Sequence, residues 1–285
     1  MSKFILQIRI FGCKDNSLKS EVFMNAQKIA EHIENWLTDY AKKSAVRGFV
    51  IGISGGIDSA VTSTLCASTG LPTLCVEMPI HQPESHVSRA REHIDQLKKR
   101  FPNVTDYKAE LTVVFETFKK AFPKTETNPM YEHTLANTRA RLRMVTLYQL
   151  AGLHNSLVVG TGNKVEDFGV GFYTKYGDGG VDVSPIADLL KSEVYALGAF
   201  LNVPESILKA KPSDGLFADD RSDEDQIGAS YDELEWAMAQ DEKGRNEDEF
   251  SGRELEVFKI YRRYNRANRH KMNPIPVCEI PTEYK

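Results

Sequence analysis

Residues 49–59 read FVIGISGGIDS, an apolar run that ends in two glycines, two serines and an aspartate. The first five residues have the bulky, largely β-branched composition of a strand that is covered on both faces. Residues 60–67, AVTSTLCA, can continue as a helix. The stretch therefore predicts a buried parallel strand, a tight turn and a helix in succession.

The predicted turn is suited to holding an anion. Gly55 and Gly56 permit positive φ angles and carry no side chain, so backbone N–H groups there can approach an anion closely. The first turn of the following helix adds unpaired N–H groups and the positive end of its dipole. We therefore expect a phosphate group at this turn. The alternative is a plain glycine turn between a strand and a helix.

The turn is not a Walker A motif, because Ile57 and Asp58 stand where that motif needs a lysine and a serine or threonine. Without the lysine, the phosphate charge has to be balanced by a metal ion. Asp58 offers a hard oxygen ligand suited to Mg²⁺, and the hydroxyls of Ser54 and Ser59 can donate to phosphate oxygens.

Composition indicates a soluble enzyme in a reducing cytoplasm. The chain has 285 residues, of which 41% are hydrophobic and 27% charged, enough for one sizeable domain or two small ones. No apolar run approaches the ~20 residues that span a bilayer, and the start of the chain does not read as a secretory signal. The four cysteines form no C-x-x-C pair, which argues against a zinc ribbon and a disulfide framework.

A net charge of −4 argues against extensive contact with a phosphate backbone, so we expect neither nucleic acid nor membrane as a partner. We expect residues 21–285 to form one domain. Residues 1–20 match no motif, and we expect them to be a poorly ordered N-terminal extension.

Helical and strand-like segments alternate along the chain. The patterns predict helices within 22–40, from 58, over 84–100 and over 137–152, the last ended by Gly152, and strands over 49–53, 72–78, 103–109 and 156–159. This order predicts an α/β fold with a doubly wound, mostly parallel sheet and flanking helices.

A second loop is expected beside the first. In doubly wound sheets ligands bind beyond the carboxyl ends of the strands, where the loops after Ile53 and Val159 would both lie. The second loop continues as TGNKVEDFG over residues 161–169, so Glu166 could complete a magnesium site with Asp58. The alternative for the Glu166–Asp167 pair is a solvated turn.

A third stretch, TKYGDGGVDVSPIADLLK over residues 174–191, makes a poor core and a good binding loop, because it combines three glycines with alternating charges. The segment Ser54-Gly55-Gly56-Ile57-Asp58-Ser59 resembles the pyrophosphate-binding loop of the ATP pyrophosphatases. Together with residues 174–191, it makes the chain resemble the ammonia-dependent NAD synthetases. That resemblance implies an adenine nucleotide alpha-hydrolase-like fold and a ligase that adenylates the carboxylate of deamido-NAD with ATP before ammonia displaces AMP.

The resemblance, which covers roughly residue 22 to the C-terminus, also implies the roles of individual residues. For ATP it implies contacts from Gly52, Ile53, Ser54, Gly55, Gly56, Ile57, Asp58, Ser59, Thr161, Lys191 and Ser213, where the serine replaces a family threonine. For deamido-NAD it implies contacts from Arg141, Lys175, Asp182, His270 and Lys271. For Mg²⁺ it implies Asp58 and Glu166 as ligands. One extra residue between Thr161 and Lys175 leaves Asp167 as an alternative to Glu166.

The expected chemistry depends on cations, because a carboxylate and a triphosphate repel each other. Lys191, the metal and the loop N–H groups would neutralise the phosphates. Asp178 or Asp182 would help to deprotonate ammonia. No Ser-His-Asp or Cys-His set is evident, and no covalent enzyme intermediate is required.

Three alternatives for the function remain at this point. They are the same chemistry on nicotinate mononucleotide, a related enzyme that modifies a tRNA base or another small acid, and a nucleotide-binding module without catalysis. We expect Trp36 and Tyr40 to bury the apolar face of their helix, and we expect a homodimer with this helix near the two-fold axis. Residues 214–225 and the pair His270–Lys271 are expected to be mobile without substrates and to close over them.

Overall fold

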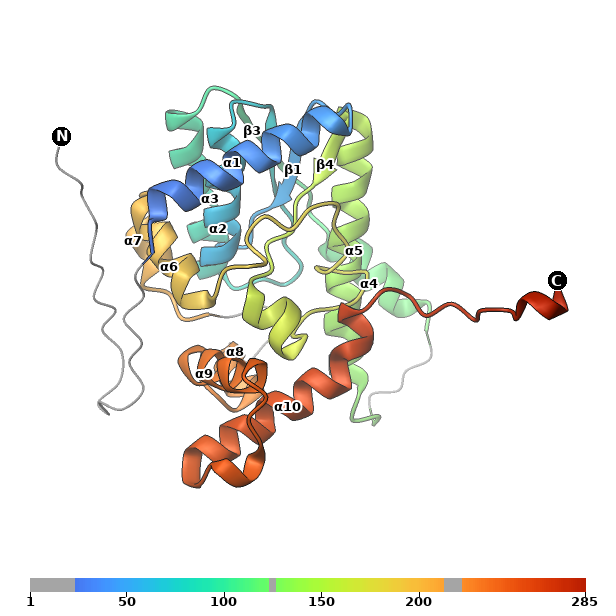
Figure 1. Ribbon diagram of the computed structural model, residues 1–285. Helices are drawn as coiled ribbons and strands as arrows, with labels where there is room; N and C mark the ends of the chain where they lie inside the picture. The colour runs from blue at the N-terminus through green and yellow to red at the C-terminus, as the bar shows by residue number, and fades with distance from the viewer. Residues whose placement is uncertain (1–23, 123–126, 213–221) are drawn as a thin grey trace.

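The structure is a computed structural model that describes residues 24–122, 127–212 and 222–285 (Figure 1). The predicted N-terminal extension and Ser213 lie outside the described residues. The assignment of residues 21–285 to one domain stays a prediction.

The centre of the fold is a parallel four-stranded sheet with the order β3-β2-β1-β4. Its strands are β1 (Gly48–Gly52), β2 (Thr73–Glu77), β3 (Val104–Lys108) and β4 (Ser156–Val158). Phe49 pairs with Thr73 of β2 on one side and with Leu157 of β4 on the other. The chain thus leaves β1 in one direction for β2 and β3 and crosses to the opposite side for β4. This arrangement confirms the predicted fold class and places the switch point of the sheet between β1 and β4.

Helices cover both faces of the sheet. Phe49 and Ile51 belong to a core shared with α1 (Ala26–Lys43), α2 (Ile57–Ser68), α3 (Glu84–Arg100), α6 (Lys191–Phe200) and α7 (Glu205–Leu208). Val50, pointing the other way, belongs to a core shared with α4 (Thr112–Lys120) and α5 (Tyr131–His154). Burial on both faces explains why β1 reads as a continuous apolar run rather than an alternating one.

A separate helical core lies beyond the carboxyl end of β4. It joins α8 (Asp223–Ile227), α9 (Tyr231–Glu242) and α10 (Gly252–Met272) to the π-helix η1 (Val165–Val170) that follows β4. Figure 1 shows these helices as a group below the sheet. η1 packs in this helical core and follows β4 in the chain. The sheet edge predicted to bind a ligand is therefore enclosed by the sheet and by the helical core.

Two sequence expectations about helices are wrong. The helix predicted over 137–152 is α5, which begins at Tyr131 and runs past Gly152 to His154; the next residue, Asn155, has a φ of 48° in the left-handed region. Asn155 ends the helix because its backbone N–H bonds back to carbonyls of the last turn.

The second error concerns α1. Trp36 and Tyr40 are 40% and 38% exposed, with ring centroids 5.6 Å apart, so they do not bury the apolar face of the helix. Ile33, Leu37 and Ala41 do so instead. These three residues follow the helical repeat, which leaves Trp36 and Tyr40 beside the buried stripe. Among the described residues, no helix combines the length and apolar character needed to cross a bilayer.

Candidate active site

The loop between β1 and α2 has the predicted strand, turn and helix order. Gly55 has a φ of +82°, and a Cβ atom there would lie 2.5 Å from the backbone oxygen of His86. Gly56 caps α2 without a side-chain hydrogen bond to the first turn, so that turn can receive an anion. The hydroxyls of Ser54 and Ser59 lie 3.1 Å apart beside it. The geometry is that of a phosphate-binding loop.

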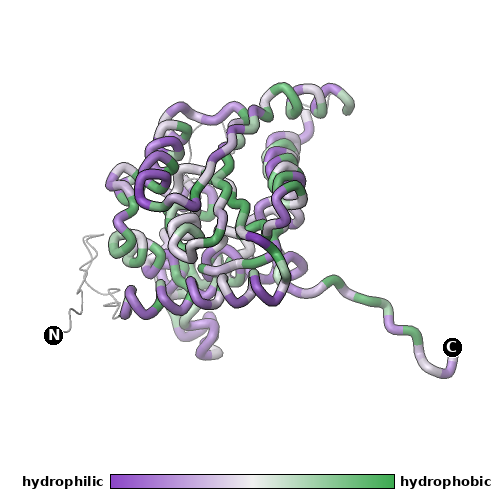
Figure 2. The backbone as a smooth tube through the Cα atoms, turned by 90° about the horizontal axis from the view of Figure 1, so that it is seen from above, coloured by the Kyte–Doolittle hydropathy of each residue, from purple (hydrophilic) through white to green (hydrophobic). Residues whose placement is uncertain are grey.

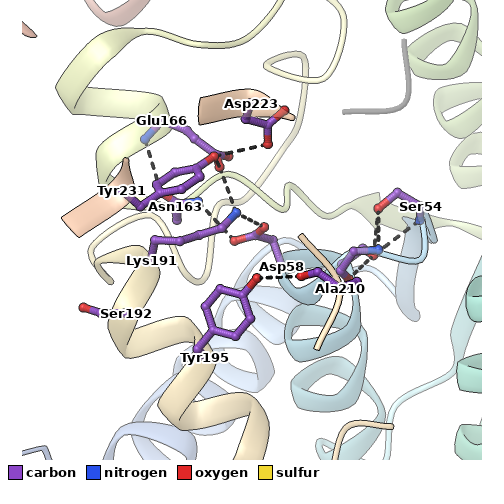
Figure 3. Close-up of polar contacts among 12 residues, drawn as sticks. Ser54, Asp58, Asn163, Glu166, Lys191, Ser192, Tyr195, Ala210, Asp223 and Tyr231 are labelled. Atoms are coloured by element: carbon purple, nitrogen blue, oxygen red, sulfur yellow. Dashed lines mark hydrogen bonds and ion pairs between the residues drawn. The ribbon is translucent and has the colours of Figure 1, made fainter. Parts of the chain in front are cut away.

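Next to this loop, one lysine joins two carboxylates (Figure 3). Lys191 Nζ lies 2.6 Å from Asp58 Oδ2 and 3.0 Å from Glu166 Oε1. Asp58 comes from the first turn of α2, Glu166 from η1 and Lys191 from the start of α6. The structure thus brings together three predicted site residues from three elements. The Lys191 side chain is only 3% exposed, which makes its pairing with the carboxylates obligatory.

Electrostatics keep this cluster charged. Burial alone would lower the pKa of Lys191, but the carboxylates of Asp58 and Glu166 raise it well above its ordinary value. Burial opposes ionisation of Glu166, yet Lys191 and the Tyr231 hydroxyl hold the pKa of Glu166 below its ordinary value. Burial raises the pKa of Asp58 against the effect of Lys191, and Glu166 adds to the rise. Two carboxylates facing one ammonium leave an excess negative charge that favours a further cation.

Neighbouring polar groups hold both carboxylates in place. Asn163 Nδ2 donates to Asp58 Oδ1 over 3.1 Å. The Tyr231 hydroxyl donates to Glu166 Oε1 over 2.5 Å and lies 3.3 Å from Asp223 Oδ2 (Figure 3). The sequence predicts no role for Asn163 or Tyr231, and it places Asp223 only in the segment 214–225 that is expected to close over the substrates. Asn163 lies in the predicted second loop, whereas nothing around Tyr231 in the sequence indicates a site.

The two carboxylates fit a magnesium ion. Within the described ranges no group of three or more His, Cys, Asp or Glu side chains is arranged to hold a metal alone. Mg²⁺ is commonly held by one or two carboxylates, with substrate phosphates and water as the other ligands. Asp58 and Glu166 already share one cation, Lys191. Their carboxylate oxygen atoms, which here surround an ammonium group, are the hard ligands that Mg²⁺ prefers.

Asp167 occupies a different position from Glu166. Its carboxylate lies against Gly162, where a Cβ atom would be 2.1 Å from Oδ1. Burial, followed by repulsion from Glu166, raises the pKa of Asp167 to about 8. Glu166, not Asp167, contacts Lys191 beside Asp58, which favours Glu166 as the second metal ligand.

The loop and the cluster line a cavity of about 1260 Å³. Most of the predicted site residues contribute to its walls: Gly52, Ile53, Ser54, Gly55, Gly56, Ile57, Asp58, Ser59, Arg141, Thr161, Glu166, Lys175, Asp178, Lys191, His270 and Lys271. Further lining residues that the sequence analysis missed include Arg89, Arg143 and Lys108. Arg143 donates to the Met78 carbonyl oxygen over 3.0 Å and to Gln82 over 2.6 Å.

Asp182 does not line this cavity. Its Oδ2 accepts from the backbone N–H of Val158 over 2.8 Å, and its Oδ1 accepts from the Tyr148 hydroxyl over 3.1 Å. These bonds fasten the loop to the end of β4, so the geometry supports a structural rather than a substrate-contacting position. Its predicted contact with the dinucleotide is not tested by these bonds and stays a prediction.

The last turn of α10 is joined to the loop that follows η1. Lys271 Nζ donates to the carbonyl oxygens of Gly171 and Tyr173 over 2.8 and 2.7 Å. Lys175 Nζ donates to the carbonyl oxygen of His270 over 2.7 Å. Both residues belong to a helix, and these bonds join the pair to the loop, but they do not test mobility without substrates, which stays a prediction.

Asp178 lines the same cavity as the glycine loop. Its Oδ1 accepts from the backbone N–H of Thr174 over 3.0 Å, and burial raises its pKa to about 6, although the side chain stays open to the cavity. A smaller pocket of about 160 Å³ is lined by both Asp167 and Asp178. A carboxylate with this pKa can accept a proton near neutral pH.

Comparisons with known proteins agree with this geometry. The family model described as NAD synthase matches residues 29–274. The NH(3)-dependent NAD(+) synthetase of Mesoplasma florum is 38% identical over 218 residues, which cover 76% of this chain and 86% of the relative. The enzyme of the same name from Methanosarcina acetivorans is 33% identical over 262 residues, covering 90% of this chain and all of the relative.

Solved structures give the same result. The NMN synthetase of Francisella tularensis superimposes with a TM-score of 0.75 at 32% identity, covering 91% of this chain and 99% of the other. The NH3-dependent NAD synthetase of Campylobacter jejuni superimposes with a TM-score of 0.72 at 28% identity, covering 90% of this chain and all of the other.

Proposed function

The chain belongs to the NAD synthase family, and on that premise we propose that it amidates the carboxylate of deamido-NAD, with ATP as co-substrate. Family membership makes it an ammonia-dependent ligase that forms a carbon–nitrogen bond. The observation that carries the proposal is the Asp58–Lys191–Glu166 cluster beside the glycine loop. A nucleotide-binding module without catalysis has no need of this buried cluster, and the same family membership argues against a tRNA-modifying enzyme.

In the first step an oxygen of the substrate carboxylate attacks the α-phosphorus of ATP, and the bond from that phosphorus to pyrophosphate breaks. The glycine loop and the first turn of α2 would hold the phosphates through backbone N–H groups. Lys191 would move from the carboxylates to the phosphates and stabilise the leaving charge. Asp58 and Glu166 would hold Mg²⁺, which neutralises phosphate charge when bound.

In the second step the nitrogen of ammonia attacks the adenylated carbonyl carbon, and the bond to AMP breaks. The nitrogen loses one proton in forming the amide. Asp178 is the group we propose for accepting it, since it faces the cavity and Asp182 does not. The small pocket lined by Asp167 and Asp178 offers a place for an ammonium ion, which would give one proton to a carboxylate there before its nitrogen can attack, in addition to the proton lost as the amide forms.

The size of the cavity supports a dinucleotide as the second substrate. Pockets for small ligands typically enclose about 300–1,000 Å³, and about 1260 Å³ leaves room for ATP and a second nucleotide. Arg141, Lys175 and Lys271 supply cations suited to its phosphates. The similarity to the NMN synthetase of Francisella tularensis keeps nicotinate mononucleotide as the second candidate.

A direct comparison of the two acids tests this proposal. The protein is incubated with ATP, Mg²⁺, ammonium and either deamido-NAD or nicotinate mononucleotide, and the amide, AMP and pyrophosphate are quantified. We expect a higher kcat/KM with deamido-NAD and equal amounts of amide and AMP. A higher kcat/KM with the mononucleotide would reassign the substrate. No amide from either acid, in a preparation shown to be folded, would overturn the proposed function.

Three further proposals concern the state of the protein. We propose a reducing cytoplasm as its compartment, supported by the buried free thiols of Cys66 and Cys75.

We propose a homodimer, which sedimentation at micromolar concentration tests. The exposed Trp36–Tyr40 pair is free to contact the second copy near the two-fold axis. The contact of Ser213 with ATP and the closure of residues 214–225 stay predictions. Of these residues the structure describes only 222–225, where Asp223, Glu224 and Asp225 belong to α8.

A further inference from the structure

The chain ends in an extended arm, residues 273–285, NPIPVCEIPTEYK. Beyond α10 it runs away from the body of the protein and ends in the short 3₁₀ helix η3 (Thr282–Tyr284) (Figure 1). Ile275, Val277 and Ile280 are 66%, 79% and 49% exposed. Figure 2 shows apolar segments along the arm. A run of apolar side chains outside the core is unfavourable in water, and such surfaces commonly mark an interaction site.

Prolines keep the arm extended. Pro274, Pro276 and Pro281 fix φ near −65° and remove three backbone donors. Segments of this composition favour the polyproline II conformation, which exists before binding and loses little entropy when it docks. The arm is therefore suited to lying in an apolar groove rather than to extending a sheet.

A complementary surface lies on α4 and just beyond its end. Val114 and Phe118 of α4 are 48% and 44% exposed, and Phe122, two residues after the helix, is 56% exposed. The rings of Phe118 and Phe122 have centroids 5.0 Å apart, so the row is continuous. Phe115, which adjoins this row on the helix surface, is buried in the core, so the row lies at the border between the buried and exposed sides of α4. We call these three residues the α4 row.

One side of the arm carries apolar side chains. In polyproline II, residues three apart lie on the same side, about 9 Å from each other, so Val277 and Ile280 share a side of the arm. That side can lie along the α4 row. Charges are also complementary, because Lys119 and Lys120 end α4, whereas the arm carries Glu279 and Glu283.

We propose that residues 274–284 dock on the α4 row of a second copy of this chain. The arm leaves its own body after α10 and does not cover its own α4 row, which remains exposed. In a two-fold symmetric dimer, each arm would dock on the α4 row of the other copy, so the apolar surfaces of both arms and both rows would be buried. The eight residues 274–281, which precede η3, span about 25 Å in polyproline II, enough to reach across an interface.

Docking in this way would connect the interface to the cavity. The arm begins two residues after Lys271, which holds the carbonyl oxygens of Gly171 and Tyr173. Fixing the arm on a second copy would thus hold the last turn of α10 against the substrate loop. The inference goes beyond the proposed function, and its test below does not depend on catalysis, so the two can fail separately.

Mixed disulfide trapping tests the exchange. One chain carries Cys13→Ser and Thr117→Cys and is truncated after Asn273, which removes Cys278. The other carries Cys13→Ser and keeps its exposed Cys278. Cys66 and Cys75 are buried in both chains, and burial raises the pKa of Cys75 to about 12, so neither reacts readily. A control chain carries Lys243→Cys in place of Thr117→Cys, at an exposed site beyond α9.

The mixture is equilibrated and mildly oxidised, and the products are resolved by intact mass. We expect at least a tenfold excess of the mixed product with Thr117→Cys over the Lys243→Cys control. Introducing Val277→Asp into the full-length partner should abolish that excess. Mixed product at the control level would overturn the proposal. In a single chain that carries both Thr117→Cys and Cys278, an intramolecular disulfide without mixed product would show that the arm folds back on its own α4.

Discussion

At the scale of single residues, Lys191 occupies the place proposed for the metal ion, between the carboxylates of Asp58 and Glu166. It balances Asp58 and Glu166 in the ligand-free protein and is also the cation proposed for the phosphates of ATP. Lys191 cannot fill both roles at once, because its ammonium group cannot lie between the carboxylates and contact the ATP phosphates at the same time. Arrival of Mg²⁺ with ATP would release Lys191, which couples metal binding to substrate binding.

Replacing Lys191 with methionine tests this exchange without any activity assay. Removing one partner from a buried ion pair typically costs about 3–5 kcal/mol, since the other charge stays uncompensated. Mg²⁺ should compensate the two carboxylates, so without ATP it should raise the Tm of Lys191→Met more than that of the parent. Lys164→Met is the control, because Lys164 lies 3.6 Å from the exposed Asp188 and outside the cluster. An equal response of parent and Lys191→Met to Mg²⁺ would contradict the idea.

Three carboxylates can be compared for the metal site. Asp58→Asn and Glu166→Gln should each lower the rate of pyrophosphate formation about 10²–10³-fold, the loss of one electrostatic contact worth about 2.7–4 kcal/mol in the transition state. Asp167→Asn should have a much smaller effect, because Asp167 lies against Gly162 and not at Lys191. Rates are measured across a range of Mg²⁺ concentrations. The opposite ranking of Glu166→Gln and Asp167→Asn would transfer the ligand role to Asp167.

At the scale of elements, the glycine loop offers a matched pair of substitutions. Gly55→Ala places an alanine at φ +82° with its Cβ 2.5 Å from the His86 carbonyl oxygen. The left-handed conformation alone costs an L-residue about 1–2 kcal/mol, so the free energy of unfolding should fall by more than about 1 kcal/mol. Gly56→Ala, with φ −95° and its nearest atom at 3.3 Å, should change it by less than about 0.5 kcal/mol. Urea unfolding measures both; equal losses would show that backbone strain does not distinguish the two positions.

The elements around the sheet could be predicted because their signals are local. The strand predicted over 49–53 is β1, shifted by one residue, and the helix predicted over 84–100 is α3. Apolar runs bounded by glycine and amphipathic repeats depend only on neighbours in the sequence. The end of α5 could not be read in this way. Gly152 resembles a helix stop, yet the left-handed residue that ends the helix is Asn155.

The candidate site was only partly predictable, because some of its contacts depend on how distant segments meet. Asp58 and Glu166 follow strands that were visible in the sequence, so their meeting at the sheet edge could be foreseen. Tyr231 reaches Glu166 from α9, through a helical core with no motif in the sequence. Asp182 shows the opposite case, since its motif suggests a substrate contact while its carboxylate is bonded to Val158 and Tyr148.

At the scale of the whole molecule, one buried histidine links stability to pH. His93 of α3 is fully buried, and its Nε2 lies 2.8 Å from the Ser63 hydroxyl of α2. Burial, reinforced by Arg100, lowers the pKa of His93 to about 4. In the unfolded chain the ordinary value of about 6.5 applies, so the unfolded state takes up this proton first as the pH falls.

The sign of the effect follows from these two values. The contribution of neutral His93 is fully present above about pH 6.5 and is lost as the pH falls toward 4. Between pH 7.5 and 5 this group alone should remove about 2 kcal/mol from the free energy of unfolding. His93→Gln, which keeps a partner for Ser63, should lose less over the same range, as measured by urea unfolding at both pH values. Equal losses in parent and variant would show that His93 is not the group responsible.

The wide separation of the site residues along the chain has a consequence for folding. Asp58 and Tyr231, both tied to the Glu166 and Lys191 pair, are more than half the chain length apart. Contacts between residues so far apart in the sequence require large loops to close. They therefore form late in folding, after the local helices and turns. A nascent or partly folded chain could present the glycine loop, which is local, but not the complete cluster. Only the completely folded protein should therefore cleave ATP, and partly folded chains should not consume nucleotide.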